Sequence, residues 1–196
     1  DCSKKLLDLI NDIMDISKIE AGEVIINSRA FDFDKSINKI YEMFLIQIEK
    51  KGLEFIFKKD VLIEFIINDE KLIGQILINL LSNAIKFTPQ NASVSFKVNL
   101  KKIENNIATI TFLVKDEGIG IAKDKLNHIF ERFKQADGST TRKYGGTGLG
   151  LAISKELAIL LGGDIKAFST LEKGSTFELI LPKKTNIQNI SDDKVT

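Results

Sequence analysis

The sequence predicts an α/β (α+β) sandwich: one mixed, mostly antiparallel sheet covered on one face by helices and preceded by one long helix. Segments with strand character come in neighbouring pairs, and longer segments with helical periodicity lie between them. A chain of 196 residues is long enough for one substantial core of this kind. Two glycine clusters, at 118–120 and 145–150, frame a polar stretch between the strands and the last helix.

Composition and charge exclude several classes of function. The net charge of +1 gives no case for nucleic acid as a partner, and no apolar run approaches the roughly 20 residues that span a bilayer. The single cysteine, Cys2, cannot form an internal disulfide, which suits a reducing compartment. We therefore expect a cytoplasmic domain, with any inner-membrane anchor of a parent protein in upstream segments. His128 is the only histidine, so we expect neither a His/Cys metal cluster nor a Ser–His–Asp triad.

The first predicted element is a helix over residues 3–20. Three- and four-residue steps form an apolar stripe of Leu6, Leu9, Ile13 and Ile16, which Ile10 widens. A stripe of this spacing suits a partner helix, whereas the alternative is a terminal helix packed on its own domain. We favour the partner helix because the stripe is wide, and Gly22 is expected to end the helix.

Alternating apolar and polar residues between turn residues predict the strands. They are residues 23–28, 53–57, 62–67, 93–100, 107–116, 165–169 and 175–181, with polar turns at 58–60, 104–106 and 172–174. Further helices are expected over 35–51, 70–86 and 147–161, with a short one near 125–130. Asp32 or Asp34 would cap the helix over 35–51, and Asn68 or Asp69 would cap the helix over 70–86.

Asn79, Asn83 and Lys86 share one face of the helix over 70–86, which is otherwise filled with apolar side chains. Amide oxygens can ligate a hard cation such as magnesium, and a lysine beside them suits phosphate oxygens. The alternative is an ordinary solvated helix face, and this pattern alone would favour that alternative.

Asp116 lies two residues after Val114 at the end of the same strand, so its side chain points to the same inward, apolar side of the sheet. A carboxylate on that apolar side needs a partner, and the amino group of a nucleotide base would be one. Gly118 and Gly120 would let such a ligand come close. The alternative is an aspartate that caps a turn.

The second glycine cluster leads into a helix, so free N–H groups and the helix dipole would face an anion. Arg142 and Lys143 precede it and are well placed for phosphates, although a charged pair in a loop is usually only solvated. We expect Phe130 and Phe133 to anchor the stretch between the clusters to the core. The polar residues 135–144 have no apolar periodicity, so we expect them to be mobile without a ligand.

Five motifs in one order along the chain resemble the catalytic and ATP-binding domain of sensor histidine kinases. They are NLLSNAIKFT at 79–88, DEGIGI at 116–121, FERF at 130–133, GTGLGL at 146–151 and GSTF at 174–177. The ATPase superfamily of that domain also includes DNA gyrase B, the ninety-kilodalton heat-shock chaperone and MutL. The preceding residues 9–22 are similar to the second helix of a dimerisation domain, and the closeness of the match indicates a hybrid-type kinase.

The resemblance implies a pocket for ATP and Mg²⁺. The catalytic residues would be Asn79, Asn83 and Lys86, with Asn83 as the magnesium ligand, and Asp116 would bind the adenine amino group. The residues implied to bind nucleotide are Asn83, Lys86, Phe87, Asp116, Gly118, Gly120, Phe133, Arg142, Lys143, Gly146, Thr147, Gly148, Leu149, Gly150 and Thr176.

The same resemblance divides the chain into three parts. Residues 1–22 would be the second helix of a truncated dimerisation domain, 23–183 the catalytic domain, and 184–196 a flexible tail or linker. The γ-phosphoryl group would pass to a histidine upstream of residue 1 in the same parent chain, so this chain would not phosphorylate itself on that residue. The parent would be a homodimer, and a response-regulator receiver domain would act downstream.

Two other functions are weighed against this one. An ATP-hydrolysing relative would use the same pocket, but such enzymes place a glutamate where this chain has Asn79, and an amide cannot take a proton from water. A degenerate, nucleotide-free interaction module is disfavoured because Asn83, Asp116 and both glycine clusters are intact.

Overall fold

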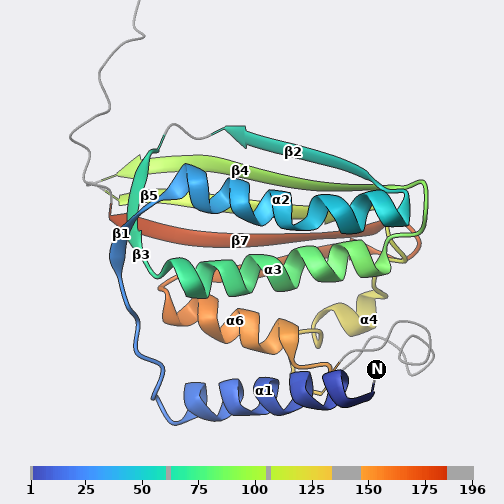
Figure 1. Ribbon diagram of the computed structural model, residues 1–196, viewed down its shortest axis with the longest axis horizontal. Helices are drawn as coiled ribbons and strands as arrows, with labels where there is room; N and C mark the ends of the chain where they lie inside the picture. The colour runs from blue at the N-terminus through green and yellow to red at the C-terminus, as the bar shows by residue number, and fades with distance from the viewer. Residues whose placement is uncertain (1, 61–62, 105–106, 134–146, 185–196) are drawn as a thin grey trace, which may run out of the picture.

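A five-stranded sheet forms one layer of the molecule, and helices cover one of its faces (Figure 1). The computed structural model describes residues 2–60, 63–104, 107–133 and 147–184. The strands lie in the order β2-β4-β5-β7-β6, with bounds β2 Glu54–Asp60, β4 Ser93–Glu104, β5 Ile107–Asp116, β7 Gly174–Lys184 and β6 Asp164–Thr170. Only the β2–β4 pair among these neighbours is parallel. The predicted mixed, mostly antiparallel sheet is confirmed.

Three helices form the covering layer: α2 (Phe33–Lys51), α3 (Glu70–Phe87) and α6 (Gly150–Leu160). A single turn of helix, α4 (Lys123–Leu126), follows β5, and α1 (Cys2–Glu20) lies on the far side of α6 from the sheet (Figure 1). Asp32 caps α2 and Asp69 caps α3 through hydrogen bonds to backbone N–H groups, so one of the two candidates at each position is confirmed. The long helix before the sandwich is confirmed as α1.

The core lies between the sheet and α3. Inward side chains of the central strands are fully buried, among them Phe96, Phe112, Val114 and Leu179. The apolar side of α3 is buried against them through Leu72, Ile73, Ile76, Leu77, Leu80, Leu81, Ala84 and Ile85. Because this side faces the sheet, the polar residues of α3 are turned toward α6 and the edge of the layer.

Two predictions about the first half of the chain were wrong. Residues 23–28 are not a strand; the first strand is β1 (Arg29–Asp32), which pairs with β3 (Phe65–Asn68) in a separate two-stranded sheet. The Asp69 side chain accepts the backbone N–H of Asn27 at 2.8 Å, so the segment before β1 is held by a side chain rather than by strand pairing.

The predicted polar turn at 58–60 belongs to β2 instead. An edge strand tolerates polar side chains on its outer face, so polarity there did not mark an end of the strand. The helix predicted from residue 147 begins at Gly150. The turn at 104–106 and the tail at 184–196 lie largely outside the described residues.

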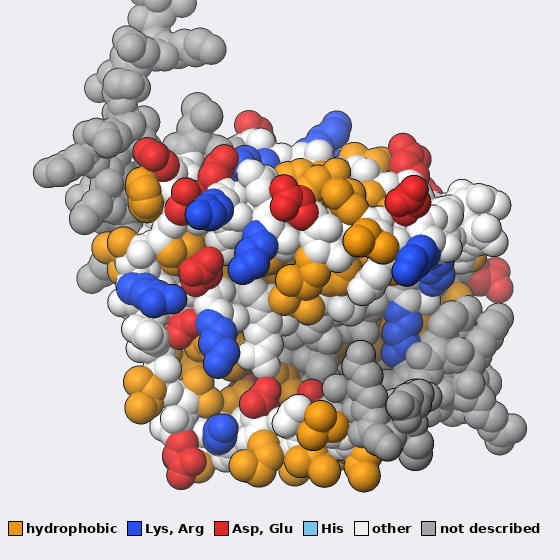
Figure 2. Space-filling view, viewed as in Figure 1, with side chains coloured by type: hydrophobic (Ala, Val, Ile, Leu, Met, Phe, Trp, Pro, Cys, Tyr) orange, Lys and Arg blue, Asp and Glu red, His pale blue; other side chains and the backbone are white. Residues whose placement is uncertain are grey.

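Helix α1 packs on its own domain with one side and exposes apolar residues on the other. Leu9, Ile16 and Ile19 are half-buried against the core. The exposed side chains are Leu6, Leu7, Ile10, Ile13 and Met14, and hydrophobic atoms gather over α1 along the lower edge of Figure 2. The predicted stripe is therefore divided. Leu9 and Ile16 pack on this domain, which was the alternative, and Leu6, Ile10 and Ile13 stay exposed and leave a surface for the predicted partner helix. Among the described residues, no helix is long and apolar enough to cross a membrane.

Candidate functional site

Asp116 ends β5 on the side of the sheet that the helices cover, and it is 4% exposed. Its Oδ1 accepts the backbone N–H of Gly118 at 2.8 Å and that of Ser175 at 3.2 Å. Burial raises the pKa of the carboxyl to about 6, and the two backbone hydrogen bonds offset part of that rise. Both bonds use Oδ1, so Oδ2 is the oxygen that can accept a hydrogen bond from a ligand.

The backbone after Asp116 passes close to α3 and leaves no room for a side chain. A Cβ on Gly118 would lie 2.6 Å from Asp116 Oδ1 and 2.7 Å from the carbonyl oxygen of Phe87. Gly120 has a φ of +65° and abuts the carbonyl group of Thr170. The first glycine cluster therefore joins the end of β5 to α3 on one side and to the β6–β7 hairpin on the other.

The predicted polar face of α3 exists, and its two amides contact each other. Asn83 donates from Nδ2 to Asn79 Oδ1 at 3.4 Å, and Asn79 donates from its own Nδ2 to Ser154 Oγ of α6 at 2.8 Å. Because Asn83 uses its NH₂ group in this way, its Oδ1 is the atom that can ligate a cation. A Cβ on Gly150 would lie 2.5 Å from Asn79 Oδ1, so α6 begins in contact with this amide.

Lys86 and Phe87 lie one turn further along α3. The Lys86 Nζ is 4.8 Å from the ring centroid of Phe87, and both side chains are half-buried. Burial lowers the pKa of Lys86 because the charged form loses water. An ammonium group in such a place interacts more strongly with a phosphate oxygen than one on an open surface.

The second glycine cluster forms the approach to α6. Thr147 Oγ1 accepts the N–H of Leu149 at 3.2 Å and donates to Asp12 Oδ2 of α1 at 2.6 Å. Gly148 has a φ of +74°, which a residue with a side chain would rarely adopt. Leu149 is fully buried, so only its backbone can face a ligand. Apart from the Leu149 N–H, which Thr147 Oγ1 holds, the backbone N–H groups of this segment lie at the start of an 11-residue helix.

The structure does not bring Thr176 to this group of residues. Thr176 pairs with Lys115 between β7 and β5, so its side chain points to the open face of the sheet, away from Asp116. Ser175, one residue earlier, lies on the Asp116 side and is 7% exposed. Ser175 rather than Thr176 is therefore the residue of this motif that lines the candidate site.

The two phenylalanines of the FERF motif also differ from each other. Phe130 is half-buried, packs against the core and has Lys155 Nζ 5.2 Å from its ring centroid. Phe133 is 67% exposed and has a φ of +59°. The expectation that both rings anchor this stretch to the core is confirmed for Phe130 and is wrong for Phe133.

Some predictions fall on residues that the structure does not describe, namely Arg142, Lys143, Gly146 and the mobility of 135–144.

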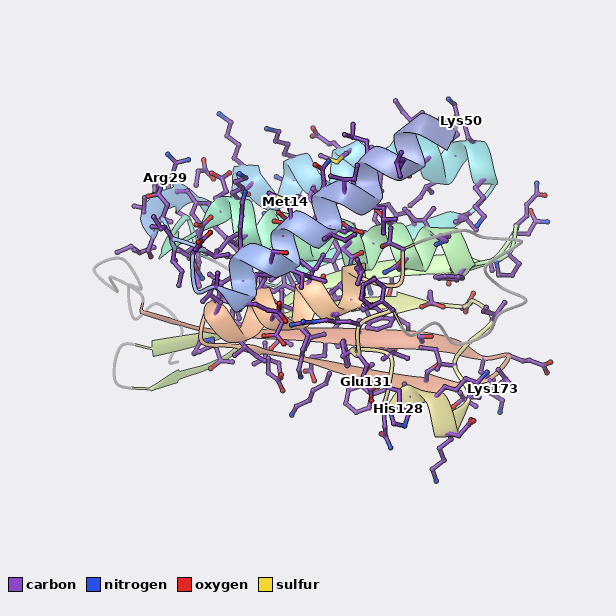
Figure 3. The ribbon with its side chains drawn as sticks, turned by 90° about the horizontal axis from the view of Figure 1, so that it is seen from below. Met14, Arg29, Lys50, His128, Glu131 and Lys173 are labelled. Carbon is purple, nitrogen blue, oxygen red and sulfur yellow. The ribbon has the colours of Figure 1, made fainter. Side chains whose placement is uncertain are left out.

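His128 is exposed and lies beside Glu131, with which it forms an ion pair when protonated (Figure 3). Within the described ranges, no three His, Cys, Asp or Glu side chains gather as a metal site.

Sequence reasoning missed Ser154, Ser175 and Lys51. Ser154 is 2% exposed and stands four residues after Gly150, between the buried Ile153 and Leu157 of α6, which marks it as a buried polar group. Ser175 shares its strand parity with the inward Phe177, so alternation could have identified it. Lys51 has no comparable signal, because its partners lie on another helix.

Comparison with known proteins identifies the family of the chain. Residues 68–185 match the family described as "Histidine kinase-, DNA gyrase B-, and HSP90-like ATPase". The chain is 43% identical over 178 residues to hybrid signal transduction histidine kinase B of Dictyostelium discoideum, covering 90% of this chain and 9% of that protein. It is also 43% identical over 180 residues to the autoinducer 2 sensor kinase/phosphatase LuxQ of Vibrio vulnificus, covering 90% of this chain and 21% of that protein.

The full-length structure of ShkA in complex with AMPPNP is similar in fold as well as sequence. It superimposes with a TM-score of 0.78 at 29% identity, and the match covers 92% of this chain and 36% of ShkA. The chain thus spans only 9% and 21% of the two curated relatives and about a third of ShkA.

Proposed function

The chain belongs to the histidine kinase-, DNA gyrase B-, and HSP90-like ATPase family, and we propose that its pocket holds ATP with Mg²⁺ for transfer of the γ-phosphoryl group to a histidine. The resemblance to the catalytic domain of hybrid-type sensor histidine kinases is confirmed by the relatives. The acceptor histidine, the dimer and the receiver domain belong to the whole protein, so they are part of this proposal.

The Asp116 carboxylate is the observation that carries the proposal. It is buried, it is fixed by two backbone N–H groups on Oδ1, and its Oδ2 can accept from a ligand. The exocyclic amino group of adenine supplies such an N–H. Gly118 has no side chain, so the backbone after Asp116 can pack against this carboxylate and the end of α3 and keep its N–H on Oδ1.

The phosphate end of the nucleotide would lie between α3 and the start of α6. Lys86 would contact phosphate oxygens, and the backbone N–H groups around Gly148 would face the remaining negative charge. Asn83 would hold the magnesium ion through Oδ1, and Asn79 keeps the Asn83 amide in the required orientation. The ion would neutralise charge on the phosphates, and the residues of the chain would position them for in-line transfer.

Transfer rather than hydrolysis follows from the chemistry of Asn79. Its amide accepts from Asn83, donates to Ser154 and has no group that can take a proton from water. We therefore expect slow release of phosphate by this chain.

The acceptor histidine would lie on a helix that packs against the exposed apolar side of α1.

A labelling experiment tests the proposal. The chain, and a longer chain that includes the upstream part of the parent protein, are incubated with ATP labelled at the γ-phosphate. We expect acid-labile label on the longer chain only, and none on longer chains that carry Asn83→Ala or Asp116→Asn. Rapid phosphate release by the short chain would support a hydrolase instead, and absence of nucleotide binding would support an interaction module.

A further inference from the structure

The last turn of α3 carries Asn83, Lys86 and Phe87, so its position determines where these three groups meet a nucleotide. The last four carbonyl groups of a helix have no hydrogen-bond partner within the helix. In α3 these are the carbonyl groups of residues 84–87. Their partners are therefore the contacts that hold this turn in place.

Two of the four carbonyl groups are bound by the C-cap residue of α3 and by the first glycine cluster. The Ala84 carbonyl oxygen accepts the N–H of Thr88 at 3.1 Å and its hydroxyl group at 2.6 Å. The Phe87 carbonyl oxygen accepts the N–H of Ile119, in the first glycine cluster, at 3.3 Å. The second of these bonds joins the last turn of α3 directly to the segment that follows Asp116.

The remaining two carbonyl groups are bound by one lysine from another helix. Lys51 is the last residue of α2, and its Nζ donates to the carbonyl oxygens of Ile85 at 2.5 Å and Lys86 at 2.9 Å. A cation at the C-terminus of a helix also interacts favourably with the helix dipole. Lys51 is half-buried, and this burial lowers the pKa of its ammonium group.

Lys51 comes to α3 from a fixed position. Gly52, with a φ of +64°, ends α2 in a left-handed residue, and its N–H bonds back to α2. The Gly52 carbonyl oxygen accepts the N–H of Asn91, in the turn that follows α3, at 2.9 Å. The end of α2 is thus held both to the last turn of α3, through Lys51, and to the turn that follows α3, through Gly52.

We propose that Lys51 is a positioning residue of the nucleotide pocket, which acts through the last turn of α3 rather than by contact with the nucleotide. This inference rests on the proposed function, because it assumes that Asn83, Lys86 and Phe87 bind ATP. Loss of the lysine leaves the carbonyl groups of Ile85 and Lys86 without this partner. The turn, and with it the Phe87–Ile119 bond, then loses its defined position.

Calorimetric titration with ATP and Mg²⁺ tests the inference on four proteins: the wild-type chain, Lys51→Met, Lys51→Arg and Lys50→Met. Lys50 is exposed and is the matched control, since it lies beside Lys51 at the end of α2 (Figure 3). In the same proteins without nucleotide, NMR records the amide resonance of Ile119, which reports on the bond to Phe87. Lys51→Gln, which keeps a donor, replaces Lys51→Met if the methionine variant does not fold.

We expect Lys51→Met to weaken ATP binding about five- to tenfold, the size of one charged capping interaction, and to shift the Ile119 amide. Lys51→Arg should restore most of the affinity, and Lys50→Met should match the wild type. Unchanged affinity in Lys51→Met, whatever its thermal stability, would overturn the inference. A wild type that binds no ATP while Lys51→Met shifts the Ile119 amide would instead overturn the proposed function alone.

Discussion

Asn79 of α3 donates a 2.8 Å hydrogen bond to the hydroxyl group of Ser154 on α6, and this bond joins the two helices that border the candidate pocket. Ser154 is buried, so the bond is shielded from water. Asn79, for which the resemblance implies a catalytic role, therefore has a structural role in joining the two helices. Gly150 lies against the same amide, which fixes where α6 begins.

Ser154→Ala is expected to lower the free energy of unfolding by about 1–3 kcal/mol, because the Asn79 NH₂ group loses its partner in a partly buried place. Urea denaturation measures this change. Ser28→Ala is the control: Ser28 is exposed, so its replacement should change stability by less than about 0.5 kcal/mol. Equal stability of the two variants would contradict a structural role for the Asn79–Ser154 bond.

Asp116 should make the free energy of unfolding depend on pH. Burial raises the pKa of its carboxyl from the ordinary 3.8 to about 6, so between these values the folded chain binds more protons than the unfolded chain. Stability contributed by this group therefore falls as the pH rises through that window and is constant above it. The difference in unfolding free energy between wild type and Asp116→Asn, measured from pH 4 to pH 8, isolates this effect. A difference that does not depend on pH would show that Asp116 is not buried as described.

The same carboxyl should make nucleotide affinity depend on pH. The adenine amino group donates more strongly to an ionised carboxylate than to a protonated carboxyl, so ATP affinity should decrease as the pH falls below about 6. Because ATP also changes its own charge in this range, adenosine is the better probe. Adenosine affinity that stays constant from pH 5 to pH 8 would count against Asp116 as the base-binding group.

Two glycines, one beside Asp116 and one in the first half of α3, should respond in opposite ways to alanine. Gly118→Ala places a Cβ 2.6 Å from Asp116 Oδ1, so we expect a loss of ATP binding and of stability. Gly74→Ala places a Cβ in open space within α3, so it should raise the free energy of unfolding by about 0.5–1 kcal/mol and leave ATP affinity unchanged. Thermal unfolding and calorimetric titration of both variants measure these effects. Retention of wild-type ATP affinity by Gly118→Ala would be incompatible with so close an approach of the backbone to Asp116.

Acidic side chains of α1 hold this helix against the rest of the molecule. Asp12 accepts from Thr147, Asp15 accepts from Gln75 at 2.9 Å, and Glu20 pairs with Arg132. The double change Asp12→Ala and Asp15→Ala should therefore speed hydrogen exchange of the α1 amides, measured by mass spectrometry. Glu23→Ala, at an exposed position after α1, is the control and should leave exchange unchanged. Equal protection in the double variant would mean that apolar contacts alone hold α1.

Local patterns in the sequence were sufficient to predict much of the fold and part of the candidate site. Alternation along β5 places Asp116 inward, and a four-residue step places Asn79 and Asn83 on one face of α3. Both follow from the geometry of a single element. The same alternation, applied to β7, would have chosen Ser175 over Thr176.

Contacts between distant segments were not predictable in this way. The parallel pairing of β2 with β4 depends on a crossover through α3, and the polar end of β2 resembled a turn. Lys51 reaches carbonyl groups more than thirty positions later in the chain, which no local periodicity encodes. The Asn79–Ser154 bond likewise depends on how two helices pack.

Calorimetric titration of the chain with ATP, with and without Mg²⁺ and beside Asp116→Asn, tests the central claim most directly. We expect micromolar-scale binding to the wild type and at least about tenfold weaker binding to the variant, since a hydrogen bond to a buried charged group is lost. Asp124→Asn, an exposed change on α4, should bind like the wild type. No heat with the wild-type chain, or equal affinity in Asp116→Asn, would contradict the assignment of this pocket to ATP.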